Sequence, residues 1–170
     1  MQAAPTLTTA RLTLRMPKAT DLPAYTAYCA SERSRFVRGP FTAQEAFDKF
    51  AAIIGHWTLR GFGRYVMEYE GRAIGHVGPL AVVTDTPPEL TWTLWDGTFE
   101  GRGFATEAAQ AVKTHLFEDL GWPEMLVLVQ PENIGSRRIA EKVGARKTDE
   151  DAPAWYPGCL TYRLEATVAA

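Results

Sequence analysis

A loop between an apolar run and a helix-like run carries the residues best suited to bind an anion. It reads Gly101-Arg102-Gly103-Phe104-Ala105. The glycines let the backbone adopt positive φ and let an anion approach the amides with no Cβ in the way. A helix N-terminus adds unpaired N–H groups and about half a positive charge. With Arg102 as a further cation, the loop is predicted to bind a phosphate or pyrophosphate group.

Two common nucleotide-binding signatures do not fit this loop. A P-loop requires Gly-Lys-Ser or Gly-Lys-Thr, and the segment from Gly101 contains neither tripeptide. The dinucleotide fingerprint requires a third small residue, which would fall at Thr106, and an early acidic strand end. The loop alone leaves open the alternative that Gly101 and Gly103 only close a tight turn.

The elements that position this loop follow from hydrophobic periodicity. Alternation predicts a strand over 89–95, and apolar residues on one face predict a helix over 104–120. An apolar run over 125–129 predicts a buried strand, parallel to the first by a right-handed crossover. The two runs within 64–83 predict an antiparallel hairpin that turns at Gly71.

The remaining elements complete a mixed sheet. Strands are expected at 11–16 and 160–164, with a further short strand at 145–148 left open, and helices are expected at about 20–30, 43–59 and 136–143. The expected fold class is α/β, with about six to seven mostly antiparallel strands and helices on both faces. At 170 residues the chain fits one domain, 1–170, with its core over about 9–164.

Composition excludes several classes of protein. Hydrophobic residues at 46% and charged residues at 22% are ordinary for a globular domain, which excludes disorder and coiled coils. The net charge of -2 disfavours a nucleic-acid partner. Cys29 and Cys159 have no metal-ligand or disulfide spacing. Without a recognisable signal peptide or a membrane-length apolar run, we expect a cytoplasmic protein with no membrane partner.

Three segments resemble those of the GNAT acetyltransferase superfamily. Glu100 to Ala105 is similar to its motif A, Arg/Gln-x-x-Gly-x-Gly/Ala. Asn133 to Gly144 resembles the Asn-x-x-Ser…Glu-Lys-x-Gly pattern of the branch that acetylates ribosomal-protein N-termini, the RimJ/RimL-like branch. Thr9 to Arg15 resembles that branch's first strand. The resemblance implies the GNAT fold, in which the two central parallel strands, about 89–95 and 125–129, splay apart.

The resemblance also implies an activity. The protein is expected to be an acyltransferase that moves the acetyl group of acetyl-CoA to a primary amine by direct attack in a ternary complex. A protein or peptide N-terminus is the first candidate acceptor, and a small amine or aminoglycoside is the alternative. A non-catalytic acyl-CoA-binding module on the same fold, and a homodimer, both stay open. No metal is implied.

The residues implied to bind acetyl-CoA lie on three elements. The end of a strand would pair with the pantetheine arm, the glycine loop would take the pyrophosphate, and the segment from Asn133 would contact pantetheine and sulfur. These residues are Thr93, Leu94, Trp95, Gly101, Arg102, Gly103, Phe104, Ala105, Asn133 and Ser136. Asn133 is also a sound helix cap. Arg137 and Arg138 would bind the 3′-phosphate of the coenzyme A adenosine, or would only lie exposed on a helix face.

Two positions depart from the family pattern. The first position of motif A is Glu100, where the family has Arg or Gln, so a carboxylate would lie near the pyrophosphate. Ala140 occupies the position where many members carry a tyrosine that protonates the leaving thiolate. Ser136 is therefore the candidate general acid.

The acceptor amine must lose a proton before it can attack, because an alkyl amine has a pKa near 10 in water. Glu89, acting through a water, is the first candidate base, and His76 is the second because its ordinary pKa is near neutrality. The backbone N–H of Leu94 or Trp95 would stabilise the charge on the thioester oxygen.

The acceptor site is less clearly marked in the sequence. Carboxylates and aromatic rings in 149–156 would attract an ammonium group, unless this segment is only a solvated acidic loop. The residues concerned are Asp149, Glu150, Asp151, Trp155 and Tyr156. The opposite wall is expected to contain Tyr25, Tyr28, Phe36 and Arg38.

Overall fold

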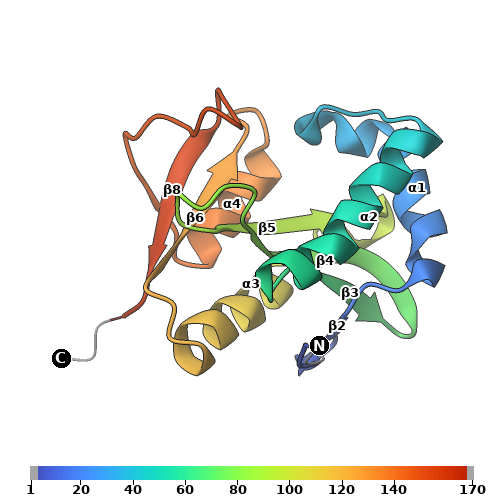
Figure 1. The fold of residues 1–170 in the computed structure, drawn as a ribbon, viewed down its shortest axis with the longest axis horizontal. Helices are drawn as coiled ribbons and strands as arrows, with labels where there is room; N and C mark the ends of the chain where they lie inside the picture. Colours follow the sequence, from blue (N-terminus) through green and yellow to red (C-terminus); the bar gives the residue numbers. More distant parts are fainter. Residues whose placement is uncertain (1–3, 168–170) are drawn as a thin grey trace.

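A computed structural model describes residues 4–167 and contains one mixed sheet within them (Figure 1). The strand order is β1-β2-β3-β4-β5-β6-β8-β7, and the neighbours are antiparallel except for β5 and β6. The strands are β1 (Leu7–Thr8), β2 (Thr13–Arg15), β3 (Tyr65–Tyr69), β4 (Arg72–Leu80), β5 (Glu89–Leu94), β6 (Glu124–Val129), β7 (Arg146–Lys147) and β8 (Leu160–Glu165).

The helical elements have clear local causes. A capping box of Thr42 and Glu45 begins α2, and Gly61 ends it at φ 77°. The helical elements are η1 (Ala19–Asp21), α1 (Leu22–Ala30), η2 (Glu32–Val37), α2 (Ala43–Arg60), η3 (Gly97–Phe99), α3 (Phe104–Thr114), η4 (His115–Asp119) and α4 (Ile134–Lys142). Among residues 4–167, no helix has the length and apolar character needed to cross a bilayer.

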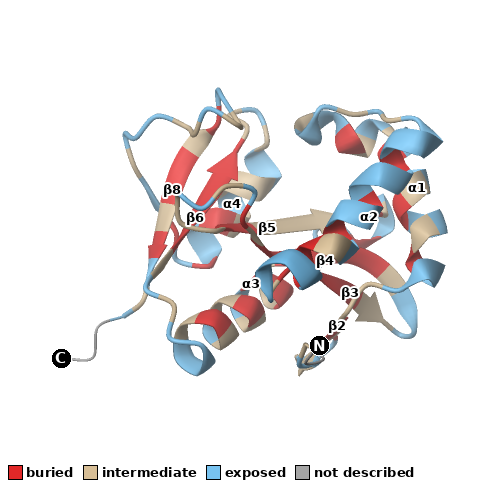
Figure 2. Ribbon diagram, in the orientation of Figure 1, coloured by how far each residue is buried: buried red, intermediate tan, exposed pale blue. Residues whose placement is uncertain are grey.

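Helices cover both faces of the sheet, which buries its strands between them (Figure 2). On one face, α1 and α2 pack with Val66 and Trp95 into an aromatic cluster that includes Tyr25. On the other face, α3 and α4 pack into the larger core, which contains Phe104 and Ala140. The sheet therefore separates a layer of α1 and α2 from a layer of α3 and α4.

The expected fold class is confirmed, with differences in detail. Eight strands occur in residues 4–167 because β1 and β7 each add two residues to an edge, and β7 is the short strand expected at 145–148. The helix expected over 104–120 changes at His115 into the π-helical turn η4. The helical segment η2 is not predicted by any periodicity. The single domain 1–170 stays a prediction, because both chain ends lie outside the described residues.

The two parallel strands separate almost as soon as they meet. Glu89 is paired with Leu126, and no further β5–β6 pair occurs among the described residues. At this pair, the Leu126 N–H donates a main-chain hydrogen bond to the Pro88 carbonyl at 2.9 Å. Beyond this point the strands diverge toward their carboxyl ends. The sheet is thereby opened in the middle, as the family resemblance predicts.

Candidate functional site

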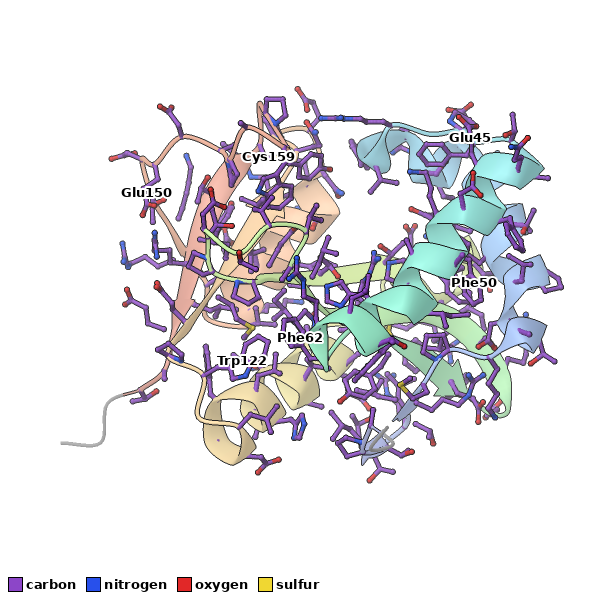
Figure 3. All side chains as sticks on the ribbon, in the orientation of Figure 1. Glu45, Phe50, Phe62, Trp122, Glu150 and Cys159 are labelled. Atoms are coloured by element: carbon purple, nitrogen blue, oxygen red, sulfur yellow. The ribbon has the colours of Figure 1, made fainter. Side chains whose placement is uncertain are left out.

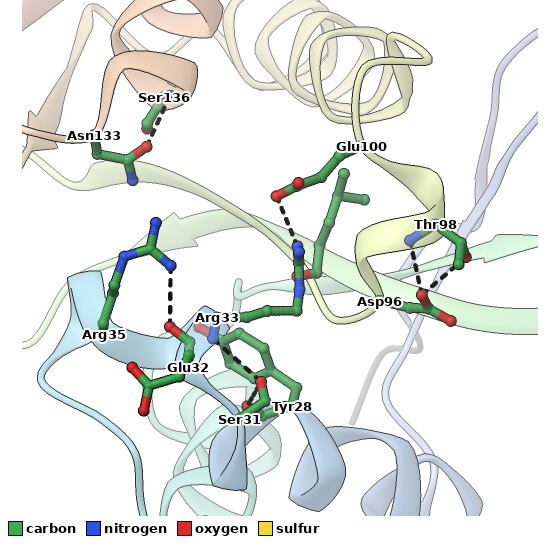
Figure 4. Close-up of polar contacts among 11 residues, drawn as sticks. Tyr28, Ser31, Glu32, Arg33, Arg35, Asp96, Thr98, Glu100, Asn133 and Ser136 are labelled. Carbon is green, nitrogen blue, oxygen red and sulfur yellow. Dashed lines mark hydrogen bonds and ion pairs between the residues drawn. The ribbon is translucent and has the colours of Figure 1, made fainter.

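A cleft of about 710 Å³ lies where β5 and β6 separate. Its walls come from η2, β5, the entrance of α3, and α4, and Figure 4 shows Asn133 and Ser136 facing Arg33 and Arg35 across it. The cleft therefore brings together elements that are far apart in the sequence. Predicted site residues on its lining are Thr93, Leu94, Gly101, Gly103, Phe104, Ala105, Asn133 and Ser136.

The entrance of α3 has backbone features that suit an anion. Gly101 and Gly103 have φ of 71° and 81°, in the left-handed region that favours glycine. Gly103 occupies the N-cap position, and no side chain caps the helix. The first amides of α3, from Phe104 onward, are therefore left for an external acceptor at the positive end of an eleven-residue helix. These features fit a pyrophosphate.

The edge of β5 that borders the cleft has hydrogen-bonding groups to offer. The Trp95 N–H already donates to the Ile74 carbonyl of β4, on the side away from the cleft, at 2.8 Å. Bonding directions alternate along an antiparallel ladder, so the N–H groups of Trp92 and Leu94 face the gap. Of the two candidate oxyanion donors, Leu94 is therefore the one whose N–H is free to act.

Ser136 is held from two sides at the start of α4. The Asn133 side-chain oxygen accepts a hydrogen bond from the Ser136 N–H at 3.1 Å, which makes Asn133 the N-cap of α4. The Trp92 indole N–H donates to the Ser136 hydroxyl oxygen at 3.0 Å, across the gap between β5 and α4. Because this oxygen accepts a bond, the hydroxyl hydrogen is available to another acceptor.

Glu89 lies at the point where β5 and β6 meet, with only 6% of its surface exposed. Burial raises the pKa of its carboxyl group to about 8, against the opposing effects of the Arg64 charge and a hydrogen bond from the Leu128 N–H. A carboxyl group with this pKa can exchange a proton near neutral pH. Burial raises the pKa values of Cys159 and Tyr156, and the charge of Glu89 adds to the increase in both.

His76 is placed differently from Glu89. It is buried and accepts a hydrogen bond at Nδ1 from the Trp95 indole at 2.9 Å. Burial holds the pKa of His76 well below its ordinary value, and the Arg64 charge acts in the same direction. Its one acceptor nitrogen is therefore occupied, whereas neither His76 nor Glu89 is among the residues that line the cleft. This environment favours Glu89 as the base.

Comparison with known proteins assigns the family. The family described as "Acetyltransferase (GNAT) domain" matches residues 11–146. The chain belongs to the GNAT acetyltransferase family. A crystal structure of an acetyltransferase from Agrobacterium tumefaciens str. C58 is 35% identical, with a TM-score of 0.88 over 97% of this chain and 96% of that one.

Two other relatives of this GNAT protein are informative. An uncharacterized N-acetyltransferase, YnaD, of Bacillus subtilis (strain 168) is 29% identical over 82 residues, so the match spans about half of either protein (48% of each). RimL, a ribosomal L7/L12 α-N-protein acetyltransferase solved with coenzyme A, has a TM-score of 0.75 over 95% of this chain and 98% of that one. At 15% identity, this likeness to RimL shows the shared fold.

The two departures of this GNAT chain from the family pattern have structural explanations. The Glu100 carboxylate forms an ion pair with Arg33 of η2 at 3.0 Å, which offsets its charge beside the α3 entrance (Figure 4). Arg33 also donates to the Leu94 carbonyl at 3.0 Å. Ala140 is fully buried in the core between α4 and the sheet, so position 140 presents no side chain to the cleft.

Arg102 occupies a different environment from the one expected. Its guanidinium lies over the Phe104 ring at 4.9 Å and the Tyr69 ring at 5.4 Å. It is absent from the cleft lining, as is the buried Trp95. Their roles in binding acetyl-CoA stay predictions. Arg138 lines the cleft, whereas Arg137 donates to the Pro131 carbonyl at 3.3 Å.

The residues expected around the acceptor amine occupy different positions relative to the cleft. Glu150 is bound to Arg163 at 2.7 Å and lies beside β8 at the outer margin of the molecule (Figure 3). Tyr25 is buried beneath the opposite wall and does not line the cleft, whereas Tyr28 does. Tyr156 donates its hydroxyl hydrogen to the Phe36 carbonyl at 2.7 Å, which joins its loop to η2 beside the cleft.

Sequence reasoning did not assign roles to Trp92, Arg33 or Arg64. The Arg64 side chain approaches Glu89 and His76 closely enough to influence both pKa values. All three residues act through partners distant in sequence, so no local motif could have found them. Within residues 4–167, no group of three or more His, Cys, Asp or Glu side chains could hold a metal ion.

Proposed function

We propose that this GNAT protein is an acetyl-CoA-dependent N-acetyltransferase that modifies a primary amine by direct attack in a ternary complex. One observation carries the proposal. The cleft where β5 and β6 separate is lined by the uncapped N-terminus of α3 and by Ser136, and the buried Glu89 lies at the β5–β6 pair where the separation begins. An anion site, a base and a hydroxyl donor are thus arranged around one opening.

Different elements of the chain would bind different parts of acetyl-CoA. The amides at the start of α3, from Phe104, would hold the pyrophosphate of acetyl-CoA, and the open edge of β5 would bond the pantetheine amides. Asn133 would contact the same arm. Acetyl-CoA supplies the activated acetyl group as a thioester.

Proton transfer is then assigned to two side chains. Glu89, through a water, would take a proton from the acceptor ammonium, so that the amine nitrogen can form the new bond to the acetyl carbon. The Leu94 N–H would stabilise the negative charge on the carbonyl oxygen. As the carbon–sulfur bond breaks, Ser136 would donate its hydroxyl proton to the sulfur and regain one, through water, from the nitrogen, which must lose its second proton to become the neutral amide. The products are the acetylated amine and free coenzyme A.

Two measurements test the proposal. Acetyl-CoA at 100 times its dissociation constant should stabilise the folded protein by about 2.7 kcal/mol, seen as a rise in Tm. Release of the free thiol should then be followed with peptides, polyamines and aminoglycosides as acceptors. The absence of any Tm shift at millimolar acetyl-CoA contradicts cofactor binding. A Tm shift without thiol release from any amine would instead favour a non-catalytic acyl-CoA-binding module.

The class of acceptor is decided by the same panel. Acetylation of peptide N-termini would place the protein functionally with the RimJ/RimL-like branch, whose members share its fold. Acetylation confined to polyamines or aminoglycosides would support the small-amine alternative. Mass spectrometry of the product identifies the nitrogen that receives the acetyl group.

A further inference from the structure

Two arginines lack a carboxylate partner within residues 4–167: Arg35 of η2, which lines the cleft, and Arg38, which follows η2 and lies beside the lining. Arg35 donates to the Glu32 carbonyl at 3.2 Å and lies over the Phe36 ring at 4.4 Å. Arg38 lies over the Tyr156 ring at 5.6 Å. Both are exposed, unlike Arg33, whose charge is paired with a glutamate. The cationic character of this wall is therefore not neutralised within the described part of the chain.

Arg38 lies close to the residues that surround the candidate base. Tyr156 is in contact with Arg38 through its ring and with η2 through its hydroxyl, which bonds the Phe36 carbonyl. Burial raises the pKa of the Cys159 thiol; the Glu89 charge acts in the same direction, and the Arg38 charge opposes it. Through Tyr156, Arg38 is in contact with a loop that is hydrogen-bonded to Phe36 on the cleft lining.

The same loop contains a donor without an acceptor. Trp155 stacks on Tyr156 with ring centroids 6.3 Å apart and an interplanar angle of 8°. The indole N–H of Trp155 is buried and has no hydrogen-bond partner within residues 4–167. An indole N–H can only donate, so a group that satisfies it must be an acceptor. The loop therefore has a donor to offer to an oxygen-bearing ligand.

We propose that the acceptor amine carries a carboxylate close to its reactive nitrogen. Arg38 binds this carboxylate, while Glu89 takes the proton from the nitrogen. The inference rests on the proposed acetyl transfer and names the acceptor class for the same site. A guanidinium binds a carboxylate through paired N–H donors, which fixes orientation as well as adding affinity. Arg35 adds positive charge to the same wall.

The carboxylate can come from two sources. A free α-amino acid carries it on the same carbon as the amine, and a peptide can carry it on an acidic side chain in its second residue. Both place a negative charge a short distance from an α-amine. Both differ from polyamines and aminoglycosides, which have no carboxylate.

Two pairs of probes test the inference. The first pair is alanine and alaninamide, and the second is the C-terminally amidated tripeptides Ala-Asp-Ala and Ala-Asn-Ala. Each pair differs by one carboxylate. The ratio of kcat/KM within a pair is measured for the wild type, for Arg38→Gln, and for Arg146→Gln. Arg146 is an exposed arginine on β7, so its replacement removes the same charge elsewhere. Comparing ratios between variants cancels the different amine pKa values of the probes.

The expected result is specific. Arg38→Gln should lower kcat/KM about tenfold for the carboxylate member of at least one pair and less than about twofold for its amide partner. Arg146→Gln should leave both ratios unchanged, and neither variant should change the KM for acetyl-CoA. An effect confined to the first pair assigns a free amino acid, and an effect confined to the second assigns an acidic peptide.

Other outcomes overturn the inference. Equal losses for both members of each pair, or no loss in either pair, would show that Arg38 does not recognise a carboxylate. Acetylation of polyamines or aminoglycosides with none of the four probes accepted would assign the other acceptor class. If acetyl-CoA binds and no amine of any class is acetylated, the proposed acetyl transfer fails, and this inference fails with it.

Discussion

At the scale of single residues, Ser136 derives its orientation from two fixed neighbours. The Asn133 cap holds its backbone, and the Trp92 indole N–H donates to its hydroxyl oxygen. A hydroxyl oxygen that already accepts one bond directs its hydrogen elsewhere and becomes a somewhat better proton donor. The proposed acid is therefore prepared by a strand on the other side of the gap.

Replacement of Ser136 separates catalysis from binding. We expect Ser136→Ala to lower kcat at least about 10²-fold, because a general acid contributes this much or more, and to change the acetyl-CoA Kd by less than about threefold. Trp92→Phe is the matched variant, since it keeps a ring and removes the N–H. Its loss in kcat should be smaller, about tenfold. An unchanged kcat in Ser136→Ala would remove the serine from the mechanism.

The two candidate bases are separated by the pH dependence of the reaction. Glu89 is active as a base only when ionised, so kcat/KM should rise with pH through about 8, where its raised pKa lies. Glu89→Gln should lower kcat about 10²- to 10⁴-fold at pH 8 and leave acetyl-CoA binding intact. His76→Asn serves as the comparison. If His76→Asn loses the rise of kcat/KM with pH and Glu89→Gln retains it, His76 is the base instead of Glu89.

At the scale of elements, the start of α3 requires backbone conformations that other residues resist. Gly103 has φ 81°, and a Cβ there would lie 3.5 Å from an Arg11 nitrogen, which is an ordinary contact. Steric exclusion within the protein is therefore weak at this position. The requirement comes from the left-handed conformation and from the amides that follow it.

Two alanine substitutions distinguish folding from anion binding. Gly103→Ala and Gly121→Ala both place a Cβ at positive φ, and each should lower stability by about 1 kcal/mol. Gly121 follows η4, at the far end of the same helical segment. Only Gly103→Ala should weaken acetyl-CoA binding, by about tenfold in calorimetry. Equal binding by the two variants would exclude the α3 entrance as the pyrophosphate site.

At the scale of the whole molecule, the burial of Glu89 where the sheet opens makes the stability of the fold depend on pH. The folded pKa of Glu89, about 8, lies above its ordinary value of 4.5, so the folded state retains a proton that the unfolded state has lost. This contribution to stability is fully present below about pH 4.5 and disappears as the pH rises through 8. His56 and His76 act oppositely, because burial lowers both pKa values and stability is lost as the pH falls.

The contribution of Glu89 can be isolated by thermal denaturation. Glu89→Gln stays neutral at every pH, and its amide oxygen can still accept a bond from the Leu128 N–H. The Tm of the variant minus that of the wild type should therefore increase steadily between pH 5 and pH 8.5. Subtraction removes the effect of the histidines, which both proteins share. A difference that does not change with pH would show that Glu89 has an ordinary pKa.

Local signals predicted much of this molecule. The glycine loop, the Asn133 cap and the alternating strands depend on neighbours in sequence, and the structure places them as expected. Contacts between distant segments were not predictable. Arg33 and Glu100 are paired across 67 positions, and Glu150 forms an ion pair with Arg163 on β8. The 3₁₀ segment η2 has no periodicity because its residues serve the cleft instead of a core.

The single rung between β5 and β6 has a consequence for handling the protein. Short strands of two residues, β1 and β7, form the outer edges of the sheet, and such short edges resist pairing with other chains. The edges inside the gap belong to six-residue strands whose backbone groups are left without a neighbouring strand. We expect the ligand-free protein to aggregate through this interior edge, and saturating coenzyme A to suppress that aggregation.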